Sequence, residues 1–353
     1  MFGFGENSFL GVDVGTSSIK LAEIEIKDNK PILSNYAWMK NTNSEKDFDQ
    51  NKFEVVLPEY LKRMVKEAKF GSRRQVFASI PAFGGFITLI ECPIMSKEEL
   101  DKAIKLEAKK YIPTSLDEVV LNWGVLGGKK GGNPADQKSL QVLLVAAPKI
   151  KIAKQEKFIQ EAGLKLRSIE IESFSLVRSL IGNDPGNFII IDIGARVCNM
   201  VLVEGGEIKV NRNINAGGRN ITKEIARNMN IDEERAEKMK ISSRNMLESQ
   251  ESKLIFPILD LIIQETKRVI LNYYGSEKNV PLNGIIISGG TANFSGLANY
   301  LQDKLGLRTI VGNPLGRVAY NSQLEPKLGL IKTQMAVCLG LALKGVEEYF
   351  KSK

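Results

Sequence analysis

The spacing of apolar residues along the chain predicts strands and helices that alternate. Alternating or β-branched apolar stretches, mostly bounded by Gly, Pro, Asn or Asp, are expected to be strands, and apolar residues three and four positions apart indicate helices. Because both kinds of element alternate in each half of the chain, the fold class is α/β. The expected strands are 9–14, 19–26, 32–39, 75–80, 86–91, 119–126, 140–146, 187–192, 198–203, 207–212 and 284–288, and the expected helices are 54–69, 97–111, 150–162, 173–181, 219–229, 232–240, 250–275, 295–305 and 333–350.

An internal repeat divides this pattern into two halves. Residues 9–25 read FLGVDVGTSSIKLAEIE, and residues 188–204 read FIIIDIGARVCNMVLVE. Each is an apolar strand, an Asp-x-Gly turn of small residues and a second alternating strand. A repeat of this kind predicts two similar α/β lobes that face each other. Two stretches interrupt the lobes, a mixed one at about 84–165 and a helical one at about 220–283.

The composition is that of an ordinary soluble globular protein. It also excludes several kinds of catalytic and metal site. The chain has 353 residues, 43% apolar and 25% charged, with a net charge of +8 and no histidine. The lack of histidine excludes Ser-His-Asp triads, Cys-His dyads and imidazole metal sites. Any chemistry must therefore use carboxylates, lysines, hydroxyls, backbone amides and a cation that a ligand brings.

The cysteines and the lack of targeting signals indicate a cytoplasmic protein. Cys92, Cys198 and Cys338 lie far apart without a CxxC pair, so we expect small buried residues in a reducing compartment. The start lacks the features of a signal peptide, and the most apolar window, 254–263, is too short to span a membrane. Lys and Arg are spread without interleaved aromatic residues, which indicates a solvated surface rather than a nucleic-acid platform. Attraction to an anionic membrane surface is the weaker alternative.

The segment GVDVGTSSIK at 11–20 carries the strongest chemical signal. Consecutive N–H groups in its turn form a nest for phosphate oxygens, and glycine allows a close approach. Lys20 adds a positive charge, and Asp13 suits a phosphate when Mg²⁺ lies between them, through water. On its own, such a turn is more often an ordinary hairpin with a structural Asp-Gly. The turn residues are Gly15, Thr16, Ser17 and Ser18.

The second acidic hairpin, IDIGARVCN at 191–199, repeats the arrangement without the lysine. Asp192 is expected to reach the same cation from the other side, while Gly194 and Ala195 bring amides to the terminal phosphate. Two acidic hairpins that face one Mg–phosphate cluster explain the internal repeat better than two unrelated turns do.

Glycine-rich turns elsewhere suit a nucleoside. The strand in ISGGT ends in a turn to a helix, where backbone without side chains lies flat against a base or ribose. INAGG precedes another helix, and RAEKMK places Glu and Lys three apart on one helix face. Taken singly, these are a tight turn and a solvated salt bridge. The residues concerned are Gly217, Gly218, Glu237, Lys240, Gly289, Gly290 and Thr291.

The order of two DxG hairpins and a GGT turn resembles the actin-like ATPase superfamily, which includes sugar kinases, heat-shock chaperones, MreB and FtsA. The insertion at 84–165 lies where FtsA carries its extra small domain. ELDKAIKLEAKKYIP, EIESFSLVRSL and GGRNIT, with a short C-terminus after GLALKG, resemble the PilM family, the cytoplasmic actin-like component of type IV pilus assembly. The resemblance covers essentially the whole chain.

This resemblance implies a ribonuclease H-like fold with two lobes that bind ATP and Mg²⁺ between them. It places Glu172 where the family orients the attacking water, and the turns named above around phosphates and nucleoside. Arg196 and Cys198 stand where small hydroxyl residues are frequent, so the resemblance supports binding more than hydrolysis and implies at most a weak ATPase. The implied parts are lobe 1, subdomain 1A (1–83, 166–186 and 329–353), the FtsA-type inserted α/β subdomain 1C (84–165), lobe 2, subdomain 2A (187–219 and 284–328), and the helical subdomain 2B (220–283).

The same resemblance implies a partner, the short N-terminal cytoplasmic tail of the membrane protein PilN. The tail is expected in a groove between subdomains 1A and 1C, with nucleotide setting the conformation. Recruitment to the inner membrane through partners, contact with the pilus assembly ATPase and other platform proteins, self-association and twitching motility belong to the same expectation. For most of the groove residues, packing on their own sheet is the alternative; they are Phe86, Ile104, Ala108, Tyr111 and Ile112.

Three other functions stay open. An FtsA-like membrane-associated filament protein needs a basic amphipathic C-terminal helix, and the tail LKGVEEYFKSK is short and mixed. A small-molecule kinase needs a carboxylate base at the substrate hydroxyl, for which Glu172 is the one candidate. An inactive scaffold that has kept the fold would retain no nucleotide.

Overall fold

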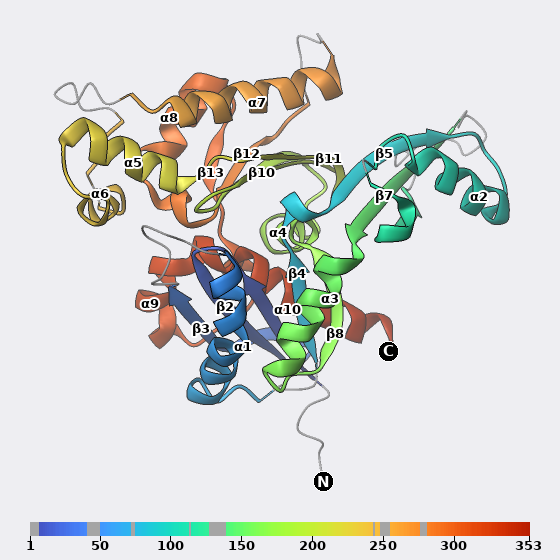
Figure 1. The fold of residues 1–353 in the computed structure, drawn as a ribbon, viewed down its shortest axis with the longest axis horizontal. Helices are drawn as coiled ribbons and strands as arrows, with labels where there is room; N and C mark the ends of the chain where they lie inside the picture. The colour runs from blue at the N-terminus through green and yellow to red at the C-terminus, as the bar shows by residue number, and fades with distance from the viewer. Residues whose placement is uncertain are drawn as a thin grey trace.

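Two five-stranded sheets form the centres of two lobes, one above the other in Figure 1, and a three-stranded sheet projects to one side. This arrangement confirms the predicted two-lobed α/β fold. The computed structural model describes residues 7–40, 50–71, 75–112, 114–126, 139–242, 244–247, 255–275 and 281–353.

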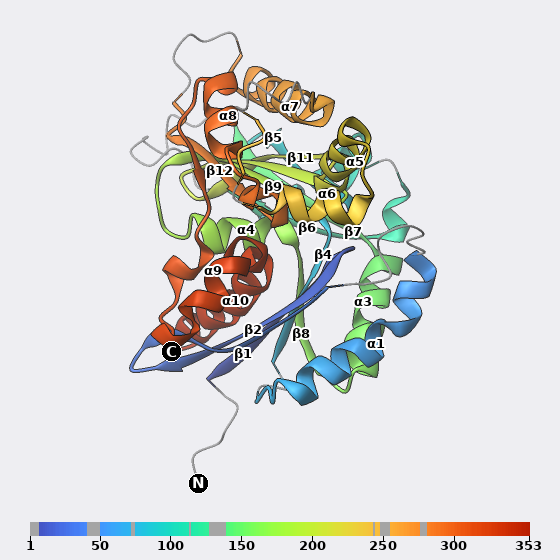
Figure 2. The same cartoon turned by 90° about the vertical axis from the view of Figure 1, so that its left-hand side faces the viewer.

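The first sheet carries apolar residues on both faces because helices cover both sides (Figure 2). Its strands, in the order β3-β2-β1-β4-β8, are β1 (Ser8–Val14), β2 (Ser18–Lys27), β3 (Lys30–Lys40), β4 (Val76–Ile80) and β8 (Leu166–Ile171), and the helices are α1 (Gln50–Glu67), α3 (Lys149–Glu161) and α10 (Ala336–Lys351). Phe9 packs with α10, whereas Leu10 and Val12 pack with α1 and α3. α10 lies so close to β1 that a Cβ on Gly11 would stand 1.9 Å from the carbonyl oxygen of Cys338.

The second sheet repeats the strand order of the first, which confirms the repeat predicted from the two DxG segments. In each sheet three antiparallel strands are followed by two parallel ones. α4 (Glu172–Leu180) packs between the sheets, where Leu176 and Val177 share one core with residues of both. In the order β11-β10-β9-β12-β13, the strands are β9 (Asn187–Ile193), β10 (Cys198–Glu204), β11 (Glu207–Ile214), β12 (Gly284–Ser288) and β13 (Thr309–Val311).

Four helices cover the outer face of the second sheet: α5 (Gly218–Met229), α6 (Glu233–Lys240), α7 (Pro257–Tyr274) and α8 (Leu297–Leu305). Pro257 begins α7, where its missing N–H and fixed φ suit the first turn. Leu261 is 39% exposed, whereas Leu259 and Ile263 face the core. The first residues of the expected helix, 250–254, lie outside the described residues.

The inserted segment forms its own small sheet and core. Its elements are β5 (Phe86–Cys92), α2 (Lys97–Ala108), β6 (Val119–Val125) and β7 (Leu140–Pro148), with the strand order β5-β7-β6. Ser96 caps the start of α2, since its side chain accepts from the N–H of Glu99 and the Glu99 carboxylate accepts from the N–H of Ser96. β5 also contacts β11 of the second lobe (Figure 1). The insertion therefore grows out of the first lobe and rests on the second.

Three elements escape the sequence pattern. β8 reads LRSIEI and carries charges, β13 has three residues, and α9 (Glu325–Ile331) is a short helix. Among the described residues, one stretch, Ser322–Lys351, is apolar and long enough to cross a membrane, and 67% of its most apolar window is buried inside the fold. That stretch ends in α10, which lies between the first sheet and α4. Its apolar character is therefore explained by packing in the core.

Candidate functional site

A cavity of about 920 Å³ opens between the lobes, where the two acidic hairpins face each other. It falls at the upper end of the size range of ligand pockets. Of the predicted nucleotide residues, Gly217 alone does not line it. A Cβ on Gly217 would stand 2.6 Å from the Gly194 carbonyl oxygen, so this glycine lets α5 approach the second hairpin. The predicted residues on the cavity wall are Asp13, Gly15, Thr16, Ser17, Ser18, Lys20, Glu172, Asp192, Gly194, Ala195, Gly218, Glu237, Lys240, Gly289, Gly290 and Thr291.

The first hairpin joins a carboxylate and an ammonium group across its two strands. Asp13 on β1 stands opposite Lys20 on β2, and Lys20 Nζ lies 3.0 Å from Asp13 Oδ2. The turn closes through a hydrogen bond from the Gly15 N–H to the Ser18 carbonyl, at 3.0 Å. Burial lowers the pKa of Lys20, but the attraction of Asp13 outweighs it and raises that pKa above its usual value. Lys20 therefore stays charged at the cavity wall.

The second hairpin is tied to the start of α5. The N–H groups of Gly218 and Arg219 donate to the carbonyls of Gly194 and Ala195, each at 2.9 Å. Asp192 stands next to Ser288 of β12, and burial raises the pKa of Asp192 to about 6, although Ser288 and Lys20 oppose the rise. A carboxyl that holds its proton so readily is one that lacks a full neutralising partner.

Two arginines at this end of the cavity were not assigned a role by the sequence. Arg196 follows Ala195, and Arg219 stands in the first turn of α5; both line the cavity. Burial lowers the pKa of Arg196, and the charge of Arg219 lowers it further. Glu233 balances Arg219, with 3.9 Å between their nearest atoms. The cavity therefore has positive charge beside the second hairpin. In the sequence, the sign of this feature is Arg196, which stands where the family often has a small hydroxyl residue.

Glu172 begins α4 and lies on the cavity wall. Its Oε1 accepts a hydrogen bond from the N–H of Ala82 at 2.9 Å, which fixes the carboxyl group. Burial, with the nearby charge of Asp192, raises the pKa of Glu172 to about 8. The carboxyl group therefore keeps its proton to a higher pH than an exposed glutamate does, and once it is deprotonated it can accept a proton.

The other end of the cavity is built by α5, α6 and the GGT turn. Lys240 is 6% exposed, and its Nζ lies 2.6 Å from Glu237 Oε2, 3.1 Å from the Gly218 carbonyl and 2.9 Å from Thr222 Oγ1. Burial lowers the pKa of Lys240, and Glu237 only partly offsets this. A Cβ on Gly218 would stand 2.2 Å from Thr291 Oγ1, so the GGT turn and α5 are in close contact. This end therefore offers backbone and a polar pair, as expected for a nucleoside.

Trp38 and Gln334 extend this wall from the first lobe and were missed by sequence reasoning. Trp38 Nε1 donates to Gln334 Oε1 at 3.1 Å, and both side chains line the cavity. Gln334 also lies 3.7 Å from where a Cβ on Gly290 would be. A tryptophan and a glutamine carry no motif, so only the fold shows that they belong to the site.

Three buried polar atoms on the cavity wall lack a hydrogen-bond partner among the described residues. They are Gln155 Nε2, Asn199 Oδ1 and Thr333 Oγ1. Buried polar side chains are nearly always paired in native proteins. Their position in one cavity therefore indicates a ligand or water that would complete them.

An apolar arm of the cavity runs between α1, α3 and the 3₁₀ turn Ala82–Gly84, at the base of the insertion. Leu57 and Phe158 are buried in it, and Phe83 at its mouth is 62% exposed. Gln155 also lines this arm. Lys151 Nζ lies 6.0 Å from the centre of the Phe83 ring, so an amphipathic rim surrounds the opening.

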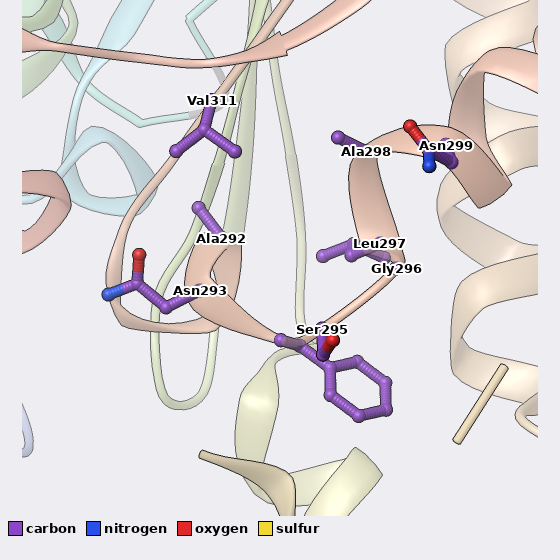
Figure 3. A pocket seen from close by; sticks show the side chains of 9 residues that line it. Ala292, Asn293, Ser295, Gly296, Leu297, Ala298, Asn299 and Val311 are labelled. Atoms are coloured by element: carbon purple, nitrogen blue, oxygen red, sulfur yellow. The ribbon is translucent and has the colours of Figure 1, made fainter. Parts of the chain in front are cut away.

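A second, smaller hollow lies against the start of α8. Its volume is about 250 Å³, and it is lined by 292–299 and Val311, as Figure 3 shows. Asn293 lines both hollows. The small hollow has no charged side chain and adds no chemistry to the site.

The residues predicted to hold a partner peptide do not form one open surface. Ile104, Ala108 and Ile112 are at most 5% exposed, because they form the core of the insertion beneath its own sheet. Phe86 packs partly against the same core, and Tyr111 is 46% exposed. In this conformation the three buried residues cannot contact a peptide. Of the apolar residues named in the arm, Leu57 and Phe158 are also buried and Phe83 is the exposed one.

Comparison with known proteins gives consistent matches. The family model described as "Type IV pilus assembly protein PilM" matches residues 11–346. A solved PilM-PilN type IV pilus biogenesis complex is 26% identical, with a TM-score of 0.79, over 96% of this chain and 98% of that chain. FtsA of Neisseria meningitidis is 23% identical over 62% of this chain and 61% of its own length, so the chain spans less than two thirds of that protein. MreB5 of Spiroplasma citri bound to ADP shares the fold, with a TM-score of 0.53 and 14% identity over 98% of this chain and 99% of that chain.

Proposed function

Because the chain belongs to the PilM family of type IV pilus assembly proteins, we propose that it is the cytoplasmic ATP-binding component of the pilus assembly platform at the inner membrane. The observation that carries the nucleotide part is the interlobe cavity, whose wall holds both acidic hairpins, Lys20 and the GGT turn. The proposed partner is PilN, because the similar solved structure is a PilM-PilN complex.

The residues on the wall fit ATP with Mg²⁺. The turn amides and Lys20 suit phosphate oxygens, and the glycines of α5 and the GGT turn leave backbone for the nucleoside. Among the described residues no three acidic, Cys or His side chains form a metal cluster. This agrees with Mg²⁺, which is usually held by one or two carboxylates, substrate phosphates and water. Asp13 and Asp192 would supply these carboxylates.

Each residue then has a defined task. Lys20 keeps its charge through Asp13 and would neutralise phosphate, while Asp192 would help Asp13 to hold the cation. Mg²⁺, when bound, neutralises charge on the phosphate oxygens. Glu172, held by the Ala82 N–H, stands where a carboxyl group can accept a proton from water. Binding at both lobes lets the ligand favour one relative position of the lobes.

The proposed groove for the PilN tail is the apolar arm between α1, α3 and the 3₁₀ turn. Leu57, Phe158 and Phe83 offer apolar contacts, and Gln155 Nε2 is a buried donor that a peptide carbonyl would satisfy. The arm lies between the first lobe and the insertion, where the family resemblance expects the groove. Since it belongs to the same cavity as the hairpins, nucleotide and peptide are placed to influence one another.

Nucleotide binding can be followed with the chain's own tryptophan. Trp38 lines the cavity and Trp123 lies on β6 of the insertion, so the fluorescence of a Trp123→Phe variant reports on the cavity alone. We expect Mg-ATP to change this signal, and Asp192→Asn to weaken the Mg-dependent affinity about tenfold, or about 1.4 kcal/mol. Asp303→Asn, on the exposed face of α8, is the matched control. No response to Mg-ATP or Mg-ADP would contradict the proposal.

Peptide binding needs a separate test. A synthetic peptide with the N-terminal sequence of PilN from the same organism is titrated into the protein by calorimetry. Phe83→Ala is expected to weaken binding about tenfold. Leu106→Ala removes an equally exposed apolar side chain from α2, at 67% exposure, and should leave the affinity unchanged. An equal loss of peptide affinity in both variants would contradict the placement of the groove in the apolar arm.

A further inference from the structure

Asn199 on β10 has a buried side-chain amide of which only the nitrogen makes a hydrogen bond. It is 2% exposed and lines the interlobe cavity. Its Nδ2 donates to Ser173 Oγ at 3.1 Å, and Ser173 Oγ donates to Asn211 Oδ1 at 2.8 Å. Asn199 Oδ1 has no hydrogen-bond partner among the residues that the structure describes.

The direction of this chain of hydrogen bonds fixes the free atom. Ser173 has one hydroxyl proton and gives it to Asn211, so Ser173 must accept from the amide nitrogen of Asn199. The carbonyl oxygen of Asn199 is therefore the atom left over. A buried acceptor without a donor is costly, and it can be completed only by a group that donates a hydrogen bond.

The position of Asn199 points to the donor. Asn199 stands directly opposite Asp192 in the sheet, and its partner Ser173 follows Glu172 in the chain. Asn199, Glu172 and Asp192 all line the cavity, at the hairpin end rather than at the end built by α6. A donor that reaches Asn199 Oδ1 would therefore lie at the same part of the cavity wall as Glu172 and Asp192.

We propose that Asn199 Oδ1 and the Glu172 carboxylate each accept a hydrogen bond from one of the two O–H groups of the water molecule that attacks the terminal phosphate of ATP. This inference rests on the proposed nucleotide site. With both protons held, an oxygen lone pair of the water faces the phosphorus. The water oxygen forms a bond to the terminal phosphorus, and the bond from that phosphorus to the bridging oxygen breaks. ADP leaves with the electron pair, one water proton passes to Glu172 and then to solvent, and the other stays on the oxygen of the released phosphate.

The neighbouring strand offers a matched control. Asn213 on β11 pairs in register with Asn199, and its side-chain oxygen is also buried without a partner among the described residues, but it does not line the cavity. Replacement of either asparagine by alanine removes one buried amide from the same sheet. Of the two, only Asn199 belongs to the cavity wall, so only Asn199→Ala should affect a ligand in the cavity.

The experiment compares the wild type, Asn199→Ala and Asn213→Ala in three measurements. The first is single-turnover hydrolysis of Mg-ATP, the second is affinity for the non-hydrolysable analogue AMPPNP with Mg²⁺, and the third is retention of Mg-ADP with aluminium fluoride, which mimics the phosphoryl group under attack. Asn199→Ala is expected to lose about tenfold or more in hydrolysis and in aluminium fluoride-dependent retention. Its AMPPNP affinity should stay within about twofold, and Asn213→Ala should match the wild type in all three.

Several outcomes would overturn the inference. These are hydrolysis by Asn199→Ala within about twofold of the wild type, an equal loss in Asn213→Ala, or a parallel loss of AMPPNP affinity in Asn199→Ala. A wild type that binds Mg-ATP without hydrolysing it above the rate in buffer overturns this inference and leaves the proposed function intact. A wild type that binds no nucleotide overturns the proposed function, and this inference with it.

If Asn199→Ala does not fold, Asn199→Asp provides the test, because it keeps the shape and an oxygen acceptor. The added carboxylate stands near Glu172, which already faces Asp192 and Asp13, with Lys20 as the opposing cation. A further negative charge raises the pKa of Glu172, so the rising limb of the pH–rate profile should move to higher pH. A profile that stays in place would overturn the inference.

Discussion

Lys20 Nζ lies 3.0 Å from Asp13 Oδ2, directly across the first hairpin, and both side chains are about nine-tenths buried. Each group is therefore the main compensation for the charge of the other until a ligand arrives. Loss of either leaves an uncompensated charge in the interior, which is costly.

A double-mutant cycle on this pair should show strong coupling. Asp13→Ala and Lys20→Met are each expected to lower the free energy of unfolding by about 2–3 kcal/mol, and the double variant should lose about 1–2 kcal/mol less than the sum. Urea unfolding in the absence of nucleotide measures all three variants. Additive losses would mean that the pair contributes nothing as a pair.

Gly218→Ala should disturb the nucleoside end of the cavity. The new Cβ would stand 2.2 Å from Thr291 Oγ1 and 3.3 Å from Lys240 Nζ, so we expect a destabilisation of about 1–3 kcal/mol and weaker ATP binding. Thr291→Ala in the same chain removes the closest atom and should recover part of both losses. Gly124→Ala has nothing within 4 Å and serves as the control. A Gly218→Ala variant with wild-type stability and affinity would rule out this close packing.

Glu172 should make the protein less stable as the pH rises. Its pKa is raised from an ordinary value of about 4.3 to about 8 in the folded protein. Between these values the folded state keeps a proton that the unfolded state has lost, so stability falls as pH rises. Glu172→Gln resembles the protonated form and should remove this loss. The variant's advantage in free energy of unfolding should grow from pH 4 to about pH 8; a constant difference would disprove the assignment.

Glu170 should have the opposite effect, at acid pH. Arg178 Nη1 lies 2.6 Å from Glu170 Oε1 and Lys344 Nζ lies 3.2 Å from its Oε2. Burial raises the pKa of Glu170, but the two cations and Ser175 outweigh it, and the pKa is lowered. The stabilisation is therefore complete above the ordinary glutamate value of about 4.3 and is lost as the pH falls through the lower folded value.

Urea unfolding between pH 6 and pH 3 tests this effect. The difference between the wild type and Glu170→Gln should shrink as the solution becomes more acidic. Glu348→Gln breaks an ion pair with Arg167 whose side chains are 40% and 62% exposed, so it should give a small difference that does not change with pH. A Glu170→Gln difference that stays the same from pH 6 to pH 3 would contradict the assigned pKa direction.

The sequence predicts those parts of the site that depend on local geometry. Asp13 faces Lys20 because a short turn sets the register of a hairpin, and the repeat around Asp192 implies a second hairpin of the same shape. The contact between Gly218 and Thr291 joins segments far apart in the chain, so no local pattern reveals it. The unpaired oxygen of Asn199 depends on which neighbours surround it after folding.

The apolar face of α2 in the insertion shows most clearly what the sequence cannot predict. The spacing of Ile104 and Ala108 predicts one apolar stripe, and the stripe exists. Periodicity cannot tell whether such a stripe meets its own sheet or a partner, because both are apolar surfaces. Here the insertion's own strands cover it, whereas Phe83, in the 3₁₀ turn at the base of the insertion, is 62% exposed and lines the cavity.

β5 of the insertion contacts β11 of the second lobe. When the lobes rotate relative to each other, the insertion would therefore pivot about this contact. β7 runs for nine residues through the insertion, a length of about 30 Å. A rotation of about 10° between the lobes, similar to known rigid-body transitions, would carry the far end of that strand about 5 Å. A small motion at the cavity would thus become a displacement as wide as one strand spacing at the outer tip of the molecule.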